Sequence, residues 1–283
     1  MYKALSSELL WFPNLPIAED MALAQNYGYR GIGFDIKSVS KEYKADAFAK
    51  LLEKHNLEPA SFALPVEFRL DDDTFRADLE QLEAHCQYAS LIQAQNCTAY
   101  ILPYSDTLDY SINLAMYRER LRRIADLLEA YGLLLGLEFL GPPSLRKDRA
   151  HEFIHDLTGM LELLELVESP NLGHLLDAFH WDMAGQVYED FARITRENPV
   201  VVAHLSDAPL GLSREEQPNH QRELPGATGV VNIKDFMEGL YNLRYEGPVF
   251  VEPFNAALRD LPFEEAVKAA KTAMDRVWIE LVQ

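Results

Sequence analysis

Short apolar runs alternate with longer amphipathic stretches along the whole chain, and this alternation constrains the fold most strongly. The apolar runs have the length of β-strands and lie near residues 3–10, 31–36, 58–64, 98–103, 133–139, 172–177, 200–206 and 248–253. The other stretches carry apolar residues three and four positions apart, which is typical of amphipathic helices, near residues 16–27, 42–55, 74–94, 109–130, 152–167, 183–196, 232–243 and 262–280. Strict alternation of strands and helices predicts a parallel sheet with helices packed outside it.

The number of units indicates that this sheet closes on itself. Eight strand–helix units in 283 residues favour a single (β/α)8 barrel, the TIM barrel of the α/β class, with residues 1–283 forming one domain. Runs such as VVVAHL and PVFVEP are apolar at almost every position, as expected for strands that are covered on both faces. An open doubly wound sheet is the alternative, but no glycine-rich phosphate loop follows the first strand.

Capping residues stand where the predicted helices begin and end. We expect the acidic residues 71–73 and Asn232 to cap helix N-termini. Gly28, Gly132 and Gly247 stand just before strands, where glycine commonly ends a helix.

Charge and cysteine content narrow the possible partners and the cellular location. The net charge of −19 repels nucleic acid and anionic lipid, and we therefore expect neither as a partner. No apolar run approaches the roughly 20 residues that cross a bilayer, and the N-terminus lacks the features of a secretory signal. Cys86 and Cys97 show no metal or disulfide spacing, so we expect two core-filling thiols in a cytoplasmic protein.

Four consecutive predicted strands each end in one side chain that can bind a metal. These residues are Glu138 in LGLEFLG, Asp177 in LLDAFHW, His204 in VVAHLSD and Glu252 in VFVEPF. The C-terminal ends of barrel strands meet at one mouth, so the four side chains should converge there. Taken singly, a carboxylate at a strand end is more often ion-paired, and a strand histidine more often belongs to the core.

The convergence of three carboxylates calls for a counter-charge. They would raise each other's pKa unless a cation neutralised them, and no Lys stands at the ends of strands five to eight. A divalent ion is the simplest solution. Three oxygen ligands and one imidazole suit Mn²⁺ first and Mg²⁺ or Co²⁺ next. Zn²⁺ is also possible, although its sites more often show additional His or Cys ligands.

Several of these segments resemble a known superfamily. LGLEFLG, LLDAFHWD, VVAHLSDAP, RELPG and YEGPVFVEPF, within residues 133–255, are similar to the sugar phosphate isomerase/epimerase superfamily, the xylose isomerase-like barrels that include ketose 3-epimerases and inosose dehydratases. In the N-terminal half, YGYRGIGFDI and ASFALPVEFR match more loosely. The resemblance implies the same four metal ligands. It also implies that His180 and Arg222 bind substrate oxygens.

The resemblance further implies catalytic roles for Glu138 and Glu252. They would face opposite sides of the substrate, one removing a proton next to a carbonyl and the other returning one, through a metal-stabilised enediolate. His180 follows Asp177 by one helical turn and can face the same cavity, the alternative being packing on Trp181. Arg222 lies in the long segment 207–229, which we interpret as a binding loop or lid.

Other polar residues offer weaker signals. Loops after the early strands should set specificity, with surface roles as the alternative, through Asp35, Glu67, Arg69 and Tyr104. His151 and His155 are four residues apart, but HEFIHD is more typical of the first turn of a helix near the mouth than of a metal site. The residues after His180 and the length of segment 207–229 differ from the ketose 3-epimerases. Both differences bear on which substrate the protein takes, and neither bears on the metal site.

The leading hypothesis is a metal-dependent isomerase or epimerase of a neutral sugar, keto-sugar or polyol. A lyase that expels a β-hydroxyl as water is the close rival, as in inosose or 3-dehydroshikimate dehydration. An endonuclease IV-like enzyme would need more histidines and a basic groove, which the charge of −19 opposes. A non-catalytic barrel that binds a sugar or a partner is the fourth alternative. A homo-oligomer, dimer or tetramer, is expected by analogy alone.

Overall fold

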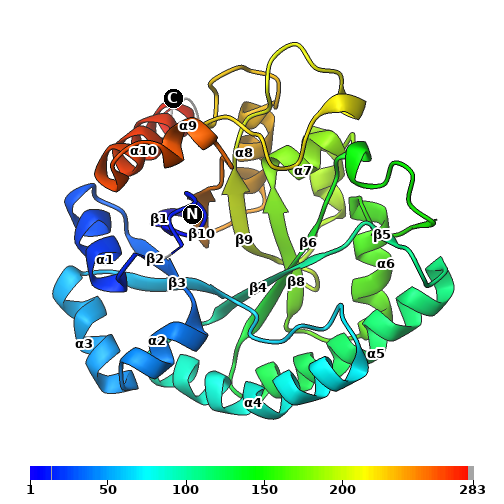
Figure 1. The fold of residues 1–283 in the computed structure, drawn as a ribbon, viewed down its shortest axis with the longest axis horizontal. Helices are drawn as coiled ribbons and strands as arrows, with labels where there is room; N and C mark the ends of the chain where they lie inside the picture. The colour runs from blue at the N-terminus through cyan, green and yellow to red at the C-terminus, as the bar shows by residue number, and fades with distance from the viewer. Residues whose placement is uncertain (14, 280–283) are drawn as a thin grey trace.

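The computed structural model describes residues 1–13 and 15–279, and its centre is a closed barrel of eight parallel strands (Figure 1). Around the barrel the order is β1-β10-β9-β8-β6-β4-β3-β2. Barrel strands that follow one another along the chain are therefore neighbours in the sheet. The bounds are β1 Tyr2–Leu5, β2 Gly31–Phe34, β3 Glu58–Ala63, β4 Asn96–Ile101, β6 Leu134–Phe139, β8 Leu172–Asp177, β9 Val200–Leu205 and β10 Pro248–Val251. The (β/α)8 fold predicted from the sequence is confirmed.

Helices surround the strands on the outside (Figure 1). They are α1 Ile17–Asn26, α2 Ile36–Glu42, α3 Ala45–His55, α4 Asp72–Leu91, α5 Tyr110–Glu129, α6 Leu157–Val167, α7 Ala178–Met183, α8 Ile233–Asn242, α9 Ala256–Arg259 and α10 Phe263–Ile279. Shorter elements are the 3₁₀ turns η1 Pro143–Leu145, η2 Tyr188–Arg193 and η3 Arg214–Glu216, and the antiparallel pair β5 Tyr104–Ser105 and β7 His151–Glu152. Within the described part of the chain, no helix has the length and apolar character needed to cross a membrane.

The capping residues behave mostly as predicted. The side chain of Asp71 accepts from the N–H groups of Asp73 and Thr74, and Asn232 accepts from Asp235. Gly28 and Gly132 adopt the left-handed φ values of 71° and 68° that favour glycine after a helix. The expectation for Gly247 is wrong, because Arg244, with φ of 55°, is the left-handed residue after α8.

Three predicted elements differ from the structure. The first strand ends at Leu5 rather than residue 10, because turn hydrogen bonds from Leu10 and Trp11 to Ser7 and Glu8 fold the apolar run back. The helix expected over 152–167 begins at Leu157, where Asp156 caps it. The helix expected over 183–196 is divided into α7, which starts five residues earlier, and η2.

The barrel interior is packed below its C-terminal mouth. A small buried cluster of Ala4, Ala60, Leu175, Val201, Val202 and Phe250 is separate from the larger core between strands and helices. Leu175, Val202 and Phe250 stand two residues before Asp177, His204 and Glu252, and alternate residues of a strand share a face. We infer that this apolar layer forms the floor on which the polar residues of the mouth rest.

Candidate metal centre

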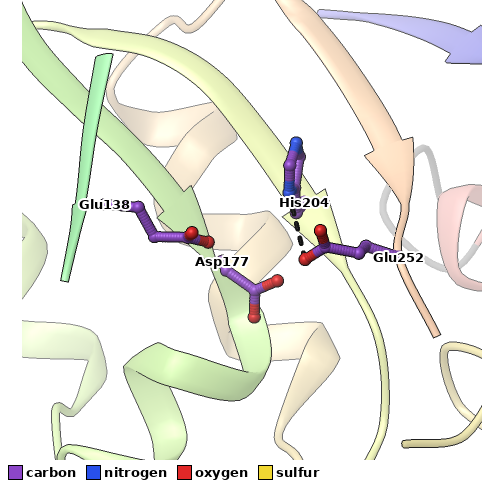
Figure 2. A group of neighbouring side chains, drawn as sticks. All are labelled: Glu138, Asp177, His204 and Glu252. Atoms are coloured by element: carbon purple, nitrogen blue, oxygen red, sulfur yellow. Dashed lines mark hydrogen bonds and ion pairs between the residues drawn. The ribbon is translucent and has the colours of Figure 1, made fainter. Parts of the chain in front are cut away.

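The four side chains predicted to bind a metal converge at the mouth of the barrel (Figure 2). Glu138, Asp177, His204 and Glu252 each offer a ligand atom, and these atoms all lie within 4.8 Å of one another. Three of the residues come from β6, β8 and β9, and Glu252 directly follows β10. All four are buried, with exposed fractions of 8%, 2%, 6% and 8%. No other group of this kind occurs among residues 1–13 and 15–279.

Neighbouring contacts fix two of these side chains. The Oδ1 atom of Asp177 accepts from the N–H groups of Phe179 and His180 at 2.7 and 3.0 Å, so Asp177 also caps α7. His204 Nδ1 lies 3.4 Å from Glu252 Oε2, and its ring packs against the edge of Phe250. Asp177 and His204 are therefore held in place by the protein itself.

A cation from the chain itself also reaches this cluster. Arg222 Nη1 lies 3.0 Å from Asp177 Oδ2 and 3.2 Å from Glu252 Oε2. The guanidinium is sandwiched between the rings of Phe179 and Phe254, each 4.5 Å from its central carbon. The strand ends supply no Lys, as noted from the sequence, but the loop residue Arg222 brings a positive charge that the strand-end residues do not indicate.

One guanidinium does not balance three carboxylates. Burial, together with repulsion from Glu252 and Asp177, raises the pKa of Glu138 well above its usual value. Burial also raises the pKa of Asp177 against the opposing effect of Arg222. Burial acts the same way on Glu252, but His204 and Arg222 outweigh it and lower its pKa. Glu138 is therefore the carboxylate with the least compensation.

The donor set fits a divalent ion. Glu138 Oε1 is buried and has no hydrogen-bond partner among the described residues, and such an atom is costly unless something pairs with it. Three carboxylates and an imidazole match the preferences of Mn²⁺, and they also accommodate Zn²⁺. The cluster could thus hold a metal, with Glu138 gaining most from it.

His180 lies on α7 beside the cluster, as predicted. Its Nδ1 faces the N–H of Gly141 at 3.2 Å, and its Nε2 lies 3.1 Å from Arg222 Nη2 and 4.0 Å from Glu138 Oε1. Burial and the positive charge of Arg222 lower its pKa well below the usual value, so the ring is neutral. Gly141 permits this approach, since a Cβ there would lie 2.1 Å from the His180 carbonyl oxygen.

A cavity of 330 Å³ opens onto Glu138, Glu252, His180 and Arg222. Of the residues expected to set specificity, Tyr104 lines this cavity. Asp35 instead caps α2, and Glu67 pairs with Arg69, whose guanidinium stacks 3.8 Å from the Tyr100 ring. His151 and Glu152 are exposed in β7, so HEFIHD is not a helical first turn.

Sequence reasoning missed further residues of this cavity, namely Tyr100, Asn219, His220 and Phe254. Phe254 follows Glu252 by two residues, so its proximity to the site could have been inferred from the end of the strand. Asn219 and His220 lie in the same long loop as Arg222, whose path the sequence does not indicate.

A family model described as xylose isomerase-like TIM barrel matches residues 21–279. The chain belongs to this family. Among relatives of this xylose isomerase-like barrel are inosose isomerases of Bacillus velezensis and Bacillus licheniformis. They are 22% and 23% identical to it, over 97% and 95% of this chain and 96% and 95% of theirs.

Solved structures of other proteins share the fold. A xylose isomerase domain protein from Alicyclobacillus acidocaldarius is 25% identical with a TM-score of 0.87, over 98% of both chains. The IOLI protein with a bound zinc atom is 19% identical with a TM-score of 0.82, over 98% of both chains. D-psicose 3-epimerase from Clostridium cellulolyticum H10 is 14% identical with a TM-score of 0.77, over 99% of both chains. The family resemblance predicted from the sequence is confirmed.

Proposed function

We propose that this protein is a divalent-metal-dependent isomerase or epimerase that transfers a proton next to the carbonyl of a keto-sugar or polyol. One observation carries the proposal: Glu138 and Glu252 line one cavity and belong to a group whose ligand atoms lie within 4.8 Å of one another. Relatives named inosose isomerase and structural neighbours named psicose 3-epimerase support this class of substrate.

We propose Mn²⁺ as the ion, held by Glu138, Asp177, His204 and Glu252. The ion would supply Lewis-acid polarisation of the substrate carbonyl. The zinc atom of the structural neighbour supports the presence of a metal and makes Zn²⁺ the alternative. The unpartnered Glu138 Oε1 supports a cation on this side of the cluster.

The two glutamates enter the cluster from opposite sides (Figure 2). A substrate bound between them would present one face to each carboxylate. In our proposal one glutamate takes a proton from the carbon next to the carbonyl, and the other returns a proton to carbon. Their burial keeps bulk water from protonating that carbon directly, so the returned proton is one that the carboxyl group acquired from solvent before the substrate bound.

His180 and Arg222 would bind substrate oxygens. A neutral imidazole accepts at one nitrogen only, and Gly141 donates to Nδ1, which favours the ring proton on Nε2. That N–H and Arg222 Nη2 are 3.1 Å apart, so two donors face each other. An acceptor oxygen within hydrogen-bond distance of both nitrogens would accept from both groups, as a hydroxyl or carbonyl of a sugar can.

Further properties follow as parts of the same proposal. Arg222 is the one Lys or Arg among the described residues that line the cavity, and it is already paired with the carboxylates of Asp177 and Glu252. The absence of a further positive charge among these lining residues supports an uncharged substrate. Cys86 and Cys97 are buried free thiols, which supports a reducing, cytoplasmic location. We also propose that the chain forms one domain.

The test is isotope exchange in deuterated water. Mn²⁺-loaded protein is incubated with inosose, D-fructose, D-tagatose and D-psicose, and products are followed by mass spectrometry and NMR. We expect one deuterium at the carbon next to the carbonyl without loss of water. The Glu252→Gln variant should abolish exchange, whereas Glu58→Gln, a control outside the cavity whose carboxylate pairs with Arg30, should retain it. Loss of water would instead indicate the lyase, and no exchange with any compound would contradict the proposal.

A further inference from the structure

Asp207 is a buried carboxylate that no step of the proposed reaction uses. It lies two residues after β9 and is 0% exposed. Its Oδ1 accepts from the N–H groups of Ala208 and Val231 at 2.8 and 2.9 Å. Its Oδ2 accepts from Thr228 and Gly229 at 2.9 and 2.8 Å. Both oxygens are thus occupied by backbone donors, which excludes a role as metal ligand or acid–base group in this conformation.

These hydrogen bonds close the long loop at both of its ends. Ala208 begins the segment 208–231, and Thr228, Gly229 and Val231 end it. The backbone of Asp207 also pairs with Glu223 in both directions, with N–O distances of 2.8 Å. Segment 208–231 is therefore folded back on Asp207 and joined to it at the residue after Arg222.

A second contact holds the main chain at Arg222 from the segment that follows β10, the strand next to β9. Asn255 Nδ2 donates to the Arg222 carbonyl oxygen at 3.1 Å and to Glu223 Oε2 at 2.8 Å. The main chain at Arg222 is thus fastened to the segment after β9 and to the segment after β10. Its guanidinium then reaches Asp177 and Glu252, which end β8 and follow β10.

We propose that Asp207 is a positioning residue that folds segment 208–231 so that Arg222 enters the metal centre. The proposal rests on the proposed function, because it gives a purpose to the placement of Arg222 within that site. Asp207 touches neither substrate nor ion; it acts through the loop. Asp207→Asn isolates this role, because an amide NH₂ would face two backbone N–H donors in place of an accepting oxygen.

The sign of the effect on metal affinity tests the proposal. Arg222→Gln removes a cation beside two ligand carboxylates, so Mn²⁺ should bind about tenfold more tightly in calorimetry. Asp207→Asn should tighten binding in the same direction if it releases Arg222. Loss of a negative charge alone, or general loosening of the site, would weaken Mn²⁺ binding. Asp71→Asn, which removes a capping carboxylate from another loop, is the charge-matched control and should leave the affinity unchanged.

The double variant decides whether Asp207 acts through Arg222. In Asp207→Asn with Arg222→Gln, Mn²⁺ affinity should equal that of Arg222→Gln alone, because no guanidinium remains to be positioned. An unchanged affinity in Asp207→Asn, a weaker one, or an effect that adds to that of Arg222→Gln would overturn the proposal.

Hydrogen exchange gives a readout that needs neither metal nor turnover. Asp207→Asn should speed amide exchange within residues 208–231 at least tenfold, and Arg222→Gln, which keeps the carboxylate clamp, should change it less. Should Asp207→Asn fail to fold, Asn255→Ser removes the bond to the Arg222 carbonyl while retaining a good helix-capping residue, and it should tighten Mn²⁺ binding likewise. Unchanged exchange in 208–231, or unchanged affinity in Asn255→Ser, would overturn the positioning role, whereas absence of turnover would bear on the proposed function alone.

Discussion

At the scale of single residues, Glu138 is the carboxylate that depends most on a bound cation. Its Oε1 has no partner among the described residues, and both Glu252 and Asp177 repel its charge. Arg222, which contacts the other two carboxylates, makes no ion pair with Glu138 within the described chain. The metal-free site is therefore strained electrostatically at this one position.

Replacing Glu138 with Gln should have opposite effects on stability and on metal binding. Removing a buried charge that lacks a partner should stabilise the metal-free protein by about 1 kcal/mol, which raises the melting temperature by about 2–4 °C. The same change removes a metal ligand and should weaken Mn²⁺ binding at least about tenfold. Calorimetric melting and titration of the two proteins measure both quantities. A less stable metal-free variant would contradict this electrostatic interpretation.

Single residues also mark the limit of what the sequence reveals about the site. Glu138, Asp177, His204 and Glu252 could be predicted because each ends an apolar strand and barrel geometry brings strand ends together. Arg222 was assigned by resemblance, but its contact with two of the carboxylates depends on a loop path without periodicity. Asp207 gave no signal, since a carboxylate that binds backbone N–H groups resembles any other loop aspartate in sequence.

At the scale of elements, β8 contains a feature that costs stability. His174 is fully buried, and neither ring nitrogen has a hydrogen-bond partner within the described residues. Burial lowers its pKa from 6.5 to about 4. The folded protein therefore resists protonation of this ring, and the unfolded chain does not.

This shift predicts a loss of stability on acidification. Between pH 6.5 and pH 4 the unfolded state binds a proton that the folded state does not, so His174 should cost about 3 kcal/mol across this window, with full stability retained above it. His174→Leu should flatten the pH dependence and add about 1 kcal/mol at pH 7, because two unpaired polar atoms disappear. Urea unfolding at several pH values measures this. Parallel pH profiles of the two proteins would contradict it.

The elements themselves were predictable to differing degrees. The eight strands follow from their apolar runs, which packing on both faces requires. The end of β1 was misjudged because turn hydrogen bonds end the strand although the apolar residues continue. The position of α7 was misjudged because the cap by Asp177 starts the helix earlier than the pattern of apolar residues indicates. α7 starts at Ala178 because Asp177 caps it, and Asp177 also belongs to the cluster, which ties the start of the helix to the site.

At the scale of the whole molecule, metal binding should be coupled to global stability. The four side chains lie at the ends of four strands that unfolding would separate, so an ion would bind the folded barrel alone. At a free Mn²⁺ concentration one hundred times Kd, the gain should be about 2.7 kcal/mol. Chelation should then lower the melting temperature by about 5–10 °C, which differential scanning calorimetry measures. Identical melting curves with and without chelator would contradict the coupling.

A divalent ion held between these four strand ends is central to the proposed chemistry. Anomalous diffraction from Mn²⁺-soaked crystals, recorded at the manganese absorption edge, tests this most directly. We predict one strong peak at bonding distance from Glu138, Asp177, His204 and Glu252. A fully soaked crystal with no peak at the barrel mouth, or with the peak elsewhere on the protein, would contradict it.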